Sequence, residues 1–88
     1  MTSDPLEALR RRFVERANAD ADVLERALLQ GERSEMERVV HGLAGAAGLF
    51  GYRALSEKAV ALDAQFARRD PLDQAMMRDL IRAARAVT

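Results

Sequence analysis

Residues 34–51 read SEMERVVHGLAGAAGLFG, and this stretch contains the clearest structural signal in the chain. Its apolar residues recur at the three- and four-residue spacing of one helix face; they are Met36, Val39, Val40, Leu43, Ala47 and Phe50. Ser34 and Glu37 form a capping box, which predicts a helix start at Ser34. Gly51 stands where a glycine commonly ends a helix. The stretch therefore predicts one amphipathic helix.

The first thirty residues carry a second helical pattern that weakens near its middle. The pair Asp4-Pro5 predicts a capped helix start. Residues 18–20 interrupt the apolar spacing, and Asp22 begins a second capping box. A continuous helix over residues 5–30 would be about 39 Å long, against about 24 Å for the next helix. We expect a break or an overhang near residues 18–20, and both one kinked helix and two separate helices remain open. The apolar positions before the interruption are Leu6, Leu9, Phe13 and Ala17.

Two further helices complete the chain. Residues 53–68 form one, with an apolar face of Leu55, Ala59, Leu62 and Phe66. The pair Asp70-Pro71 predicts the start of another, with an apolar face of Leu72, Met76, Leu80, Ala84 and Val87. No alternation typical of strands occurs. Four amphipathic helices with short connections predict an all-α, antiparallel up-down-up-down four-helix bundle in one domain, residues 1–88.

The composition excludes several classes of function. Fourteen basic and fourteen acidic residues give a formal net charge of zero, whereas a general nucleic-acid binder carries excess positive charge. The chain has no cysteine, so zinc–thiolate sites, iron–sulfur clusters and thiol nucleophiles are excluded. Its one histidine excludes a multi-histidine metal site within the chain. We therefore expect no metal site and no nucleic-acid partner.

The N-terminus MTSDPLEALRRRF lacks the apolar core of a signal peptide. The longest weakly polar run, residues 39–52, is too short to span a bilayer. We expect a cytoplasmic protein without membrane contact, and the initiator Met1 favours a free-standing one.

His41 faces away from the predicted core. On a helical wheel it lies roughly 160° from the centre of the apolar sector, with Gly48 about 20° and Gly45 about 40° from it. Each interior helical glycine is about 1 kcal/mol less favourable than alanine. We expect that position 42 is a glycine because another helix packs closely against it. Packing inside the bundle does not explain the two outward glycines, whereas a partner approaching the imidazole would.

The imidazole itself is the candidate reactive group. No cysteine or serine stands beside His41, so no nucleophile–base pair is visible. A neutral, exposed imidazole nitrogen can itself accept a phosphoryl group.

At residues 41–55, HGLAGAAGLFGYRAL, the chain resembles the phosphoacceptor segment of histidine-containing phosphotransfer (HPt) domains. The usual pattern there is His-x-x-Lys-Gly, followed by small residues, a glycine, and a further glycine with a hydrophobic residue after it. His41, Gly45, Gly48 and Gly51 match it, and the apolar positions fit as well; these are Phe50, Tyr52 and Leu55.

The resemblance implies a phosphocarrier in two-component signalling rather than a self-sufficient enzyme. His41 would become a phosphohistidine on its outer ring nitrogen and exchange the phosphoryl group with receiver-domain aspartates or a kinase. The partners would be a response-regulator receiver domain and a hybrid or sensor histidine kinase, with Mg²⁺ held by the receiver. This chain would bind no cofactor. The expected partner interface comprises Glu37, Arg38, Ala44, Gly45, Gly48 and Leu49.

One position departs from the family pattern. Ala44 stands where the family commonly has a lysine three residues after the histidine. Arg38 is a poor replacement because helical side chains lean toward the N-terminus. Lys58 would lie level with Ala44 in a hairpin turning near Gly51, so our hypothesis is that Lys58 or Arg53 partly supplies the missing charge.

Ala44 also keeps a second function open, an unphosphorylated adaptor or inhibitor that binds a receiver or a kinase. Self-association of the glycine face into a homodimer is a third interpretation, although we expect a monomer.

Overall fold

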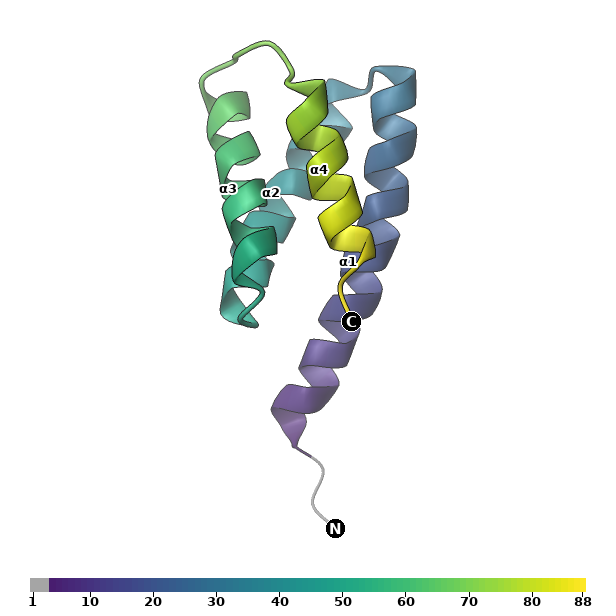
Figure 1. The fold of residues 1–88 in the computed structure, drawn as a ribbon, viewed down its shortest axis with the longest axis vertical. Helices are drawn as coiled ribbons and strands as arrows, with labels where there is room; N and C mark the ends of the chain where they lie inside the picture. The colour runs from purple at the N-terminus through teal and green to yellow at the C-terminus, as the bar shows by residue number, and fades with distance from the viewer. Residues whose placement is uncertain (1–3) are drawn as a thin grey trace.

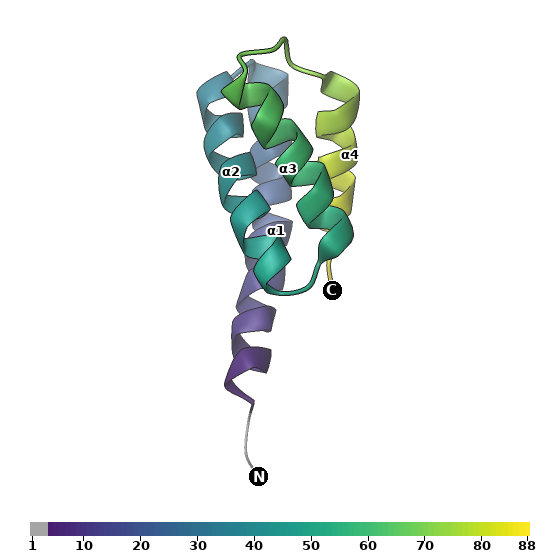
Figure 2. The ribbon, with the colours of Figure 1, turned by 90° about the vertical axis from the view of Figure 1, so that its left-hand side faces the viewer.

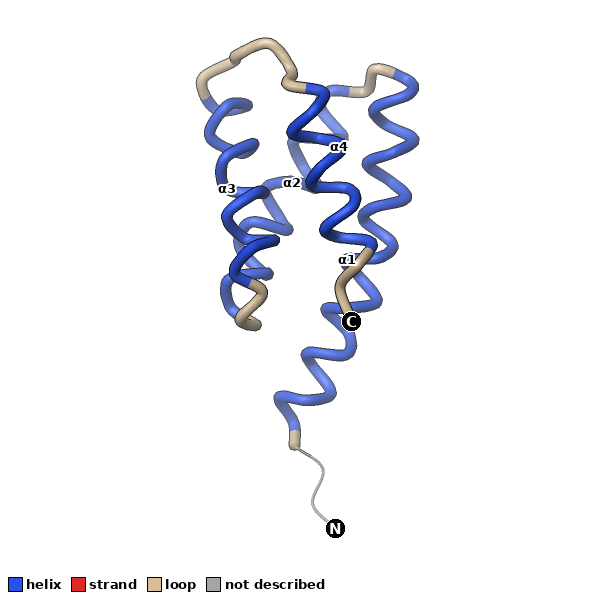
Figure 3. The backbone as a smooth tube through the Cα atoms, viewed as in Figure 1, coloured by secondary structure: helices blue, strands red, loops and turns tan. Residues whose placement is uncertain are grey.

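Four helices make up the described part of the chain, residues 4–88 of this computed structural model (Figure 1). They are α1 (Pro5–Gln30), α2 (Arg33–Leu49), α3 (Arg53–Ala67) and α4 (Gln74–Arg85). No strand occurs within residues 4–88 (Figure 3). Successive helices run antiparallel, and α4 returns to pack against α1 (Figure 2). The predicted all-α, up-down-up-down four-helix bundle is confirmed. Met1, on which the expectation of a free-standing protein rests, lies outside the described residues.

The core is formed by one apolar face of each helix. Every core position predicted for residues 34–51 and 53–68 is buried, apart from the half-buried Phe50. Within the described residues, no polar or charged residue is buried in the core. None of its helices has the length and hydropathy needed to cross a membrane. The largest fully buried side chains are Leu24, Met36, Leu43, Leu62, Met77, Leu80 and Val40.

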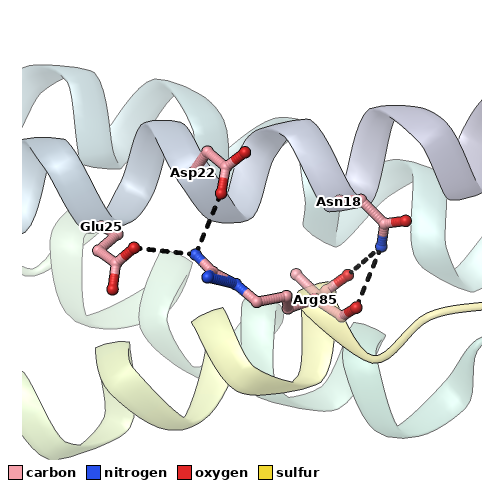
Figure 4. A network of polar contacts seen from close by, with 5 residues as sticks. Asn18, Asp22, Glu25 and Arg85 are labelled. Atoms are coloured by element: carbon pink, nitrogen blue, oxygen red, sulfur yellow. Dashed lines mark hydrogen bonds and ion pairs between the residues drawn. The ribbon is translucent and has the colours of Figure 1, made fainter.

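The predicted break near residues 18–20 is wrong, because α1 is one continuous helix. Asn18, one of the polar residues that weaken the sequence pattern, instead contacts the C-terminal end of α4, as Asp22 and Glu25 do (Figure 4). The side-chain amide of Asn18 donates to the carbonyl oxygens of Ala84, at 2.9 Å, and Val87, at 3.3 Å. The guanidinium of Arg85 lies 3.2 Å from Asp22 and 3.0 Å from Glu25. Asp22 is therefore a bridging residue in mid-helix and not a helix cap.

The overhang that was expected near residues 18–20, as the alternative to a break, is present but comprises residues 4–12. The first turns of α1 extend beyond the other helices (Figure 1), and residues 4–12 are all exposed. Leu6 and Leu9 were predicted to face the core, but they are 60% and 46% exposed. The stripe becomes buried only from Phe13 onward because no neighbouring helix reaches further. Asp4 caps this end as predicted, since its side chain accepts a hydrogen bond from the Leu6 amide at 2.9 Å.

Two other helix starts differ from the prediction. Helix α2 begins at Arg33, one residue before the predicted cap Ser34, and its N-cap residue Glu32 makes no side-chain capping bond. Helix α4 begins at Gln74, because Asp73 and not Asp70 caps it, accepting from the Met76 amide at 3.0 Å. The segment before it is a loop.

A tight hairpin between α2 and α3 sets the register of the site. Gly51 adopts a left-handed conformation with φ of 82°, so the chain can reverse after α2. Phe50 and Tyr52 flank this glycine, and their rings lie 5.4 and 5.3 Å from the ring of Phe13 on α1. This aromatic cluster fixes the lower end of the hairpin against α1, so the middle of α2 lies beside the middle of α3 (Figure 2).

Candidate functional site

His41 lies in the middle of α2 and points away from the core, as predicted. Its side chain is 79% exposed. The ring is nevertheless held on one side: Nδ1 lies 3.1 Å from Oδ1 and 3.2 Å from Oδ2 of Asp63, which projects from α3. The Asp63 side chain is 34% exposed. The imidazole is therefore oriented by a neighbouring helix while most of its surface is open to solvent.

This contact determines which ring nitrogen is free. A carboxylate oxygen can only accept a hydrogen bond, so Nδ1 of His41 carries the proton and donates to Asp63. In the neutral imidazole the second nitrogen, Nε2, then has an unshared electron pair. The exposed side of the ring thus presents a nucleophile, and the protein side presents a carboxylate that stabilises any positive charge the ring acquires.

Asp63 was not singled out from the sequence. Its position was available from the hairpin register: with a turn centred near residues 51–52, His41 lies about level with residues 62–63 of the antiparallel helix. The same register was used to place Lys58 opposite Ala44. Applied to His41, the hairpin register points to Asp63, because the other residue at this level, Leu62, belongs to the core.

The three glycines of α2 have three different surroundings. A side chain at Gly45 would meet no atom within 4 Å, so the exposed surface there is bare backbone. At Gly48 an added Cβ would lie 3.2 Å from Oγ of Ser56 on α3. The expectation that packing inside the bundle cannot explain Gly48 is therefore wrong in part, because this glycine also lets α3 approach closely.

Gly42 is covered by Arg16 of α1. A Cβ at Gly42 would lie 2.5 Å from Nη2 of Arg16, so the guanidinium occupies the space that a side chain would need. The attribution of this glycine to packing against another helix is confirmed. Arg16 was not identified from the sequence, because nothing in the spacing of α1 shows that its side chain crosses α2.

The remaining residues of the expected interface differ in their exposure. Leu49 is 80% exposed, whereas Ala44 is half-buried and packs against the core. Glu37 is half-buried in a hollow between the start of α2 and the end of α3, together with Arg33 and Arg69. Arg38 is exposed and bound to Glu35, with its Nη2 2.6 Å from Oε1. This hydrogen bond lowers the pKa of Glu35.

Lys58 and Arg53 do not lie beside His41, so the hypothesis that they supply the missing charge is not supported by the geometry. Nζ of Lys58 lies 2.6 Å from Oδ2 of Asp79 on α4, and this contact lowers the pKa of Asp79. Lys58 is about 140° around α3 from Asp63. Arg53 pairs with Glu57 at 3.2 Å, about 15 Å along the helix from Asp63.

A second carboxylate lies in the seam between α1 and α2. The Asp20 side chain is 18% exposed, and its Oδ2 lies 3.5 Å from Nε of Arg16. Burial raises the pKa of Asp20, and the nearby charges of Arg16 and Arg38 offset only part of this effect. Oδ2 makes no hydrogen bond within the described residues. The pair between Arg16 and Asp20 is therefore loose.

Residues 4–88 contain no group of three or more His, Cys, Asp or Glu side chains suited to hold a metal ion. A groove of about 540 Å³ lies elsewhere, between α1 and α4. None of its lining residues belongs to α2, so it is separate from His41.

Comparisons of the chain with curated proteins and with solved structures give no match. The sequence model of the Hpt domain matches residues 8–87, which is nearly the whole chain and includes His41. Hpt domains are phosphocarrier modules of phosphorelays, in which a histidine transfers the phosphoryl group. A four-helix bundle that presents an oriented, exposed histidine agrees with this match, and the chain belongs to the Hpt domain family.

Proposed function

We propose that His41 carries a phosphoryl group on Nε2 and exchanges it with aspartates of receiver domains, or accepts it from a histidine kinase. The observation that carries this proposal is the contact between Nδ1 of His41 and Asp63, combined with the exposure of the rest of the ring. The contact keeps the proton on Nδ1, so the nitrogen facing solvent is the nucleophilic one.

In the forward step, the electron pair of Nε2 attacks the phosphorus of an aspartyl phosphate on the receiver. A new N–P bond forms, the P–O bond breaks, and the receiver's carboxylate leaves with the bonding electrons. The ring retains the Nδ1 proton and acquires a positive charge, which the adjacent Asp63 carboxylate stabilises. The reverse transfer follows the same path.

The surroundings of His41 favour approach by a partner. The bare backbone at Gly45 leaves room on one side of the imidazole, and the exposed Leu49 supplies an apolar contact further along α2. We expect Mg²⁺ to be held by the receiver, where it would neutralise the transferring phosphoryl oxygens. We also expect the chain to act as a monomer in the cytoplasm. Sizing of the purified protein by light scattering distinguishes a monomer from a homodimer.

The test is to incubate the protein with Mg²⁺ and each of a panel of phosphorylated receiver domains, and then to measure its intact mass. The expected result is one added phosphoryl group on the wild-type chain and none on His41→Gln. The bond should be labile in acid and stable in alkali, as a phosphoramidate is. Because His41 is the only histidine, no second phosphohistidine can obscure the result.

An unphosphorylated adaptor is the second candidate, and Ala44 in place of the family's usual lysine is the observation that favours it. If the folded wild-type chain binds receivers but takes no phosphate from any of them, the phosphocarrier proposal is overturned in favour of the adaptor. Acid-stable phosphate, or equal labelling of His41→Gln, would also overturn it.

A further inference from the structure

Arg16 and Asp63 reach the neighbourhood of His41 from two different helices, α1 and α3. Asp63 contacts the ring from α3, whereas the guanidinium of Arg16 reaches across from α1 and lies on Gly42, the residue that follows His41. The Cα atoms of adjacent residues are about 3.8 Å apart. The guanidinium therefore lies against the residue next to His41 and comes from a different helix than Asp63.

A further positive charge near His41 would stabilise a phosphoryl group there, in addition to the charge that the ring acquires. The phosphoryl group adds about two negative charges at neutral pH, and the Asp63 carboxylate already lies next to the ring. Ala44 supplies no charge, while Lys58 is bound to Asp79 and Arg53 to Glu57. Arg16, in contrast, is packed against the residue next to His41.

Two features leave Arg16 free to turn toward a phosphoryl oxygen. Its side chain is 53% exposed, and its ion pair with Asp20 is long, at 3.5 Å. Arg38 also lies close enough to Asp20 to lower the pKa of that carboxyl group, so Asp20 does not depend on Arg16 alone. No side chain at Gly45, one turn after His41, blocks the path across the surface.

We propose that Arg16 supplies the positive charge that stabilises the phosphoryl group on His41, and that Gly42 is required because its missing side chain lets the guanidinium lie there. This inference rests on the proposed phosphocarrier function and assigns the electrostatic stabilisation to a residue of α1. It gives Gly42 a role different from that of Gly45, which leaves space for a partner.

The test uses a partner-free phosphodonor, potassium phosphoramidate, which transfers its phosphoryl group to imidazole and releases ammonia. Wild type, Arg16→Ala, Arg16→Lys and Gly42→Ala are labelled, and the hydrolysis rate of the phosphohistidine is measured by intact mass. The equilibrium distribution of phosphate between each variant and one receiver is then measured with Mg²⁺. Arg12→Ala is the matched control, because it removes the same charge from α1 one turn earlier.

Arg16→Ala is expected to lower the equilibrium constant for the phosphorylated form by about three- to tenfold, the scale of an exposed charge-assisted contact. Gly42→Ala should have a similar effect, because an added Cβ displaces the guanidinium. Alanine is a better helix former than glycine, so this loss would occur without a loss of helix stability, which thermal unfolding checks. Arg16→Lys should retain part of the effect, and Arg12→Ala should behave as wild type.

Equal phosphohistidine stability in wild type, Arg16→Ala and Gly42→Ala would overturn this inference and leave the phosphocarrier function intact. An equal loss in Arg12→Ala would also overturn it, because the effect would then follow net charge and not the position of Arg16. If wild type takes phosphate neither from phosphoramidate nor from receivers, the proposed function itself fails.

Discussion

Nδ1 of His41 lies 3.1 Å from Oδ1 of Asp63, so a residue on α3 determines which nitrogen of a side chain on α2 is free to react. The two residues are 22 positions apart and meet only because the hairpin at Gly51 brings the helices into register. The acceptor site is therefore a product of the α2–α3 pair and not of α2 alone.

Asp63→Ala should increase the fraction of His41 that carries its proton on Nε2, because the carboxylate no longer favours the Nδ1 tautomer. Labelling by phosphoramidate should slow by about tenfold, the lower end of the effects found when the hydrogen-bond partner of a metal-bound histidine is removed. The ¹⁵N chemical shifts of the ring measure the tautomer directly. Asp79→Ala, on another face of the bundle, is the control. Unchanged ring shifts in Asp63→Ala would contradict the assignment.

Gly45→Ala and Gly48→Ala should differ in stability although both are exposed helical glycines. Gly45→Ala should raise the free energy of unfolding by about 0.5–1 kcal/mol, the usual gain of alanine over glycine in a helix, since nothing lies near its Cβ. Gly48→Ala should gain less because its Cβ would lie 3.2 Å from Ser56 Oγ. Urea denaturation of both variants measures the difference, and an equal gain would be inconsistent with the close approach of α3.

Lys58→Ala and Arg53→Ala should transfer phosphate at the wild-type rate, because both cations point away from His41. Lys58→Ala should lower the free energy of unfolding by less than about 1 kcal/mol, as expected for a partly exposed ion pair between α3 and α4. Single-turnover transfer from a phosphorylated receiver measures the rate. A marked slowing in either variant would show that these side chains reach the phosphoryl group after all.

Asn18→Ala should destabilise the fold by about 1–3 kcal/mol, since its amide bonds carbonyl groups at the partly buried end of α4 and their loss leaves those acceptors unpaired. Asp22→Ala removes only an exposed contact with Arg85 and should cost less than about 1 kcal/mol. Urea denaturation compares the two. Equal losses would mean that the partly buried bonds of Asn18 contribute no more than the exposed contact between Asp22 and Arg85.

Asp20 should make the stability of the wild type depend on pH in the direction opposite to that of an ion-paired carboxylate. Its pKa is raised in the folded state because burial disfavours the charge. The folded state therefore binds the proton more tightly than the unfolded state. The resulting loss of stability is present at neutral pH, decreases as the pH falls through the folded pKa, and is gone below the ordinary value near 3.8.

Asp20→Asn removes this dependence. The stability of wild type relative to Asp20→Asn should increase between pH 7 and pH 4, as measured by thermal unfolding. Asp22→Asn, an exposed neighbour on α1, is the control for other carboxylates. A relative stability that decreases on acidification would show that the ion pair with Arg16 outweighs the burial of Asp20.

The helices and most of the core could be predicted from the sequence, because a period of 3.6 residues and capping residues are local signals. Asp4 was identified as a cap correctly, whereas Ser34 and Asp70 were not, since local patterns offer several caps and tertiary packing selects among them. The polar residues of α1 were misinterpreted as a break for the same reason: Asn18 bonds carbonyl groups 66 or more positions away.

The site was predictable in its centre and not at its edges. His41 and Gly45 are exposed because of their positions on one helix, which a helical wheel describes. Asp63 contacts His41 from α3, and Arg16 contacts the neighbouring Gly42 from α1. The first contact depends on the hairpin register, and the second on a long side chain that crosses a glycine. The hypothesis that Lys58 supplies charge beside His41 is not supported, because a residue at the same height along α3 as Ala44 can point to another face of the bundle. Lys58 points toward Asp79 on α4.

The overhang of α1 has a consequence for where cooperative folding begins. Residues 5–12 are all exposed, and isolated helices of so few residues are marginal in water. Their helical state therefore depends on the cap at Asp4, the proline at the first position and continuity with the buried turns that follow. We therefore expect the cooperatively folding unit to start near Phe13, and the preceding turns to open without unfolding the bundle that presents His41.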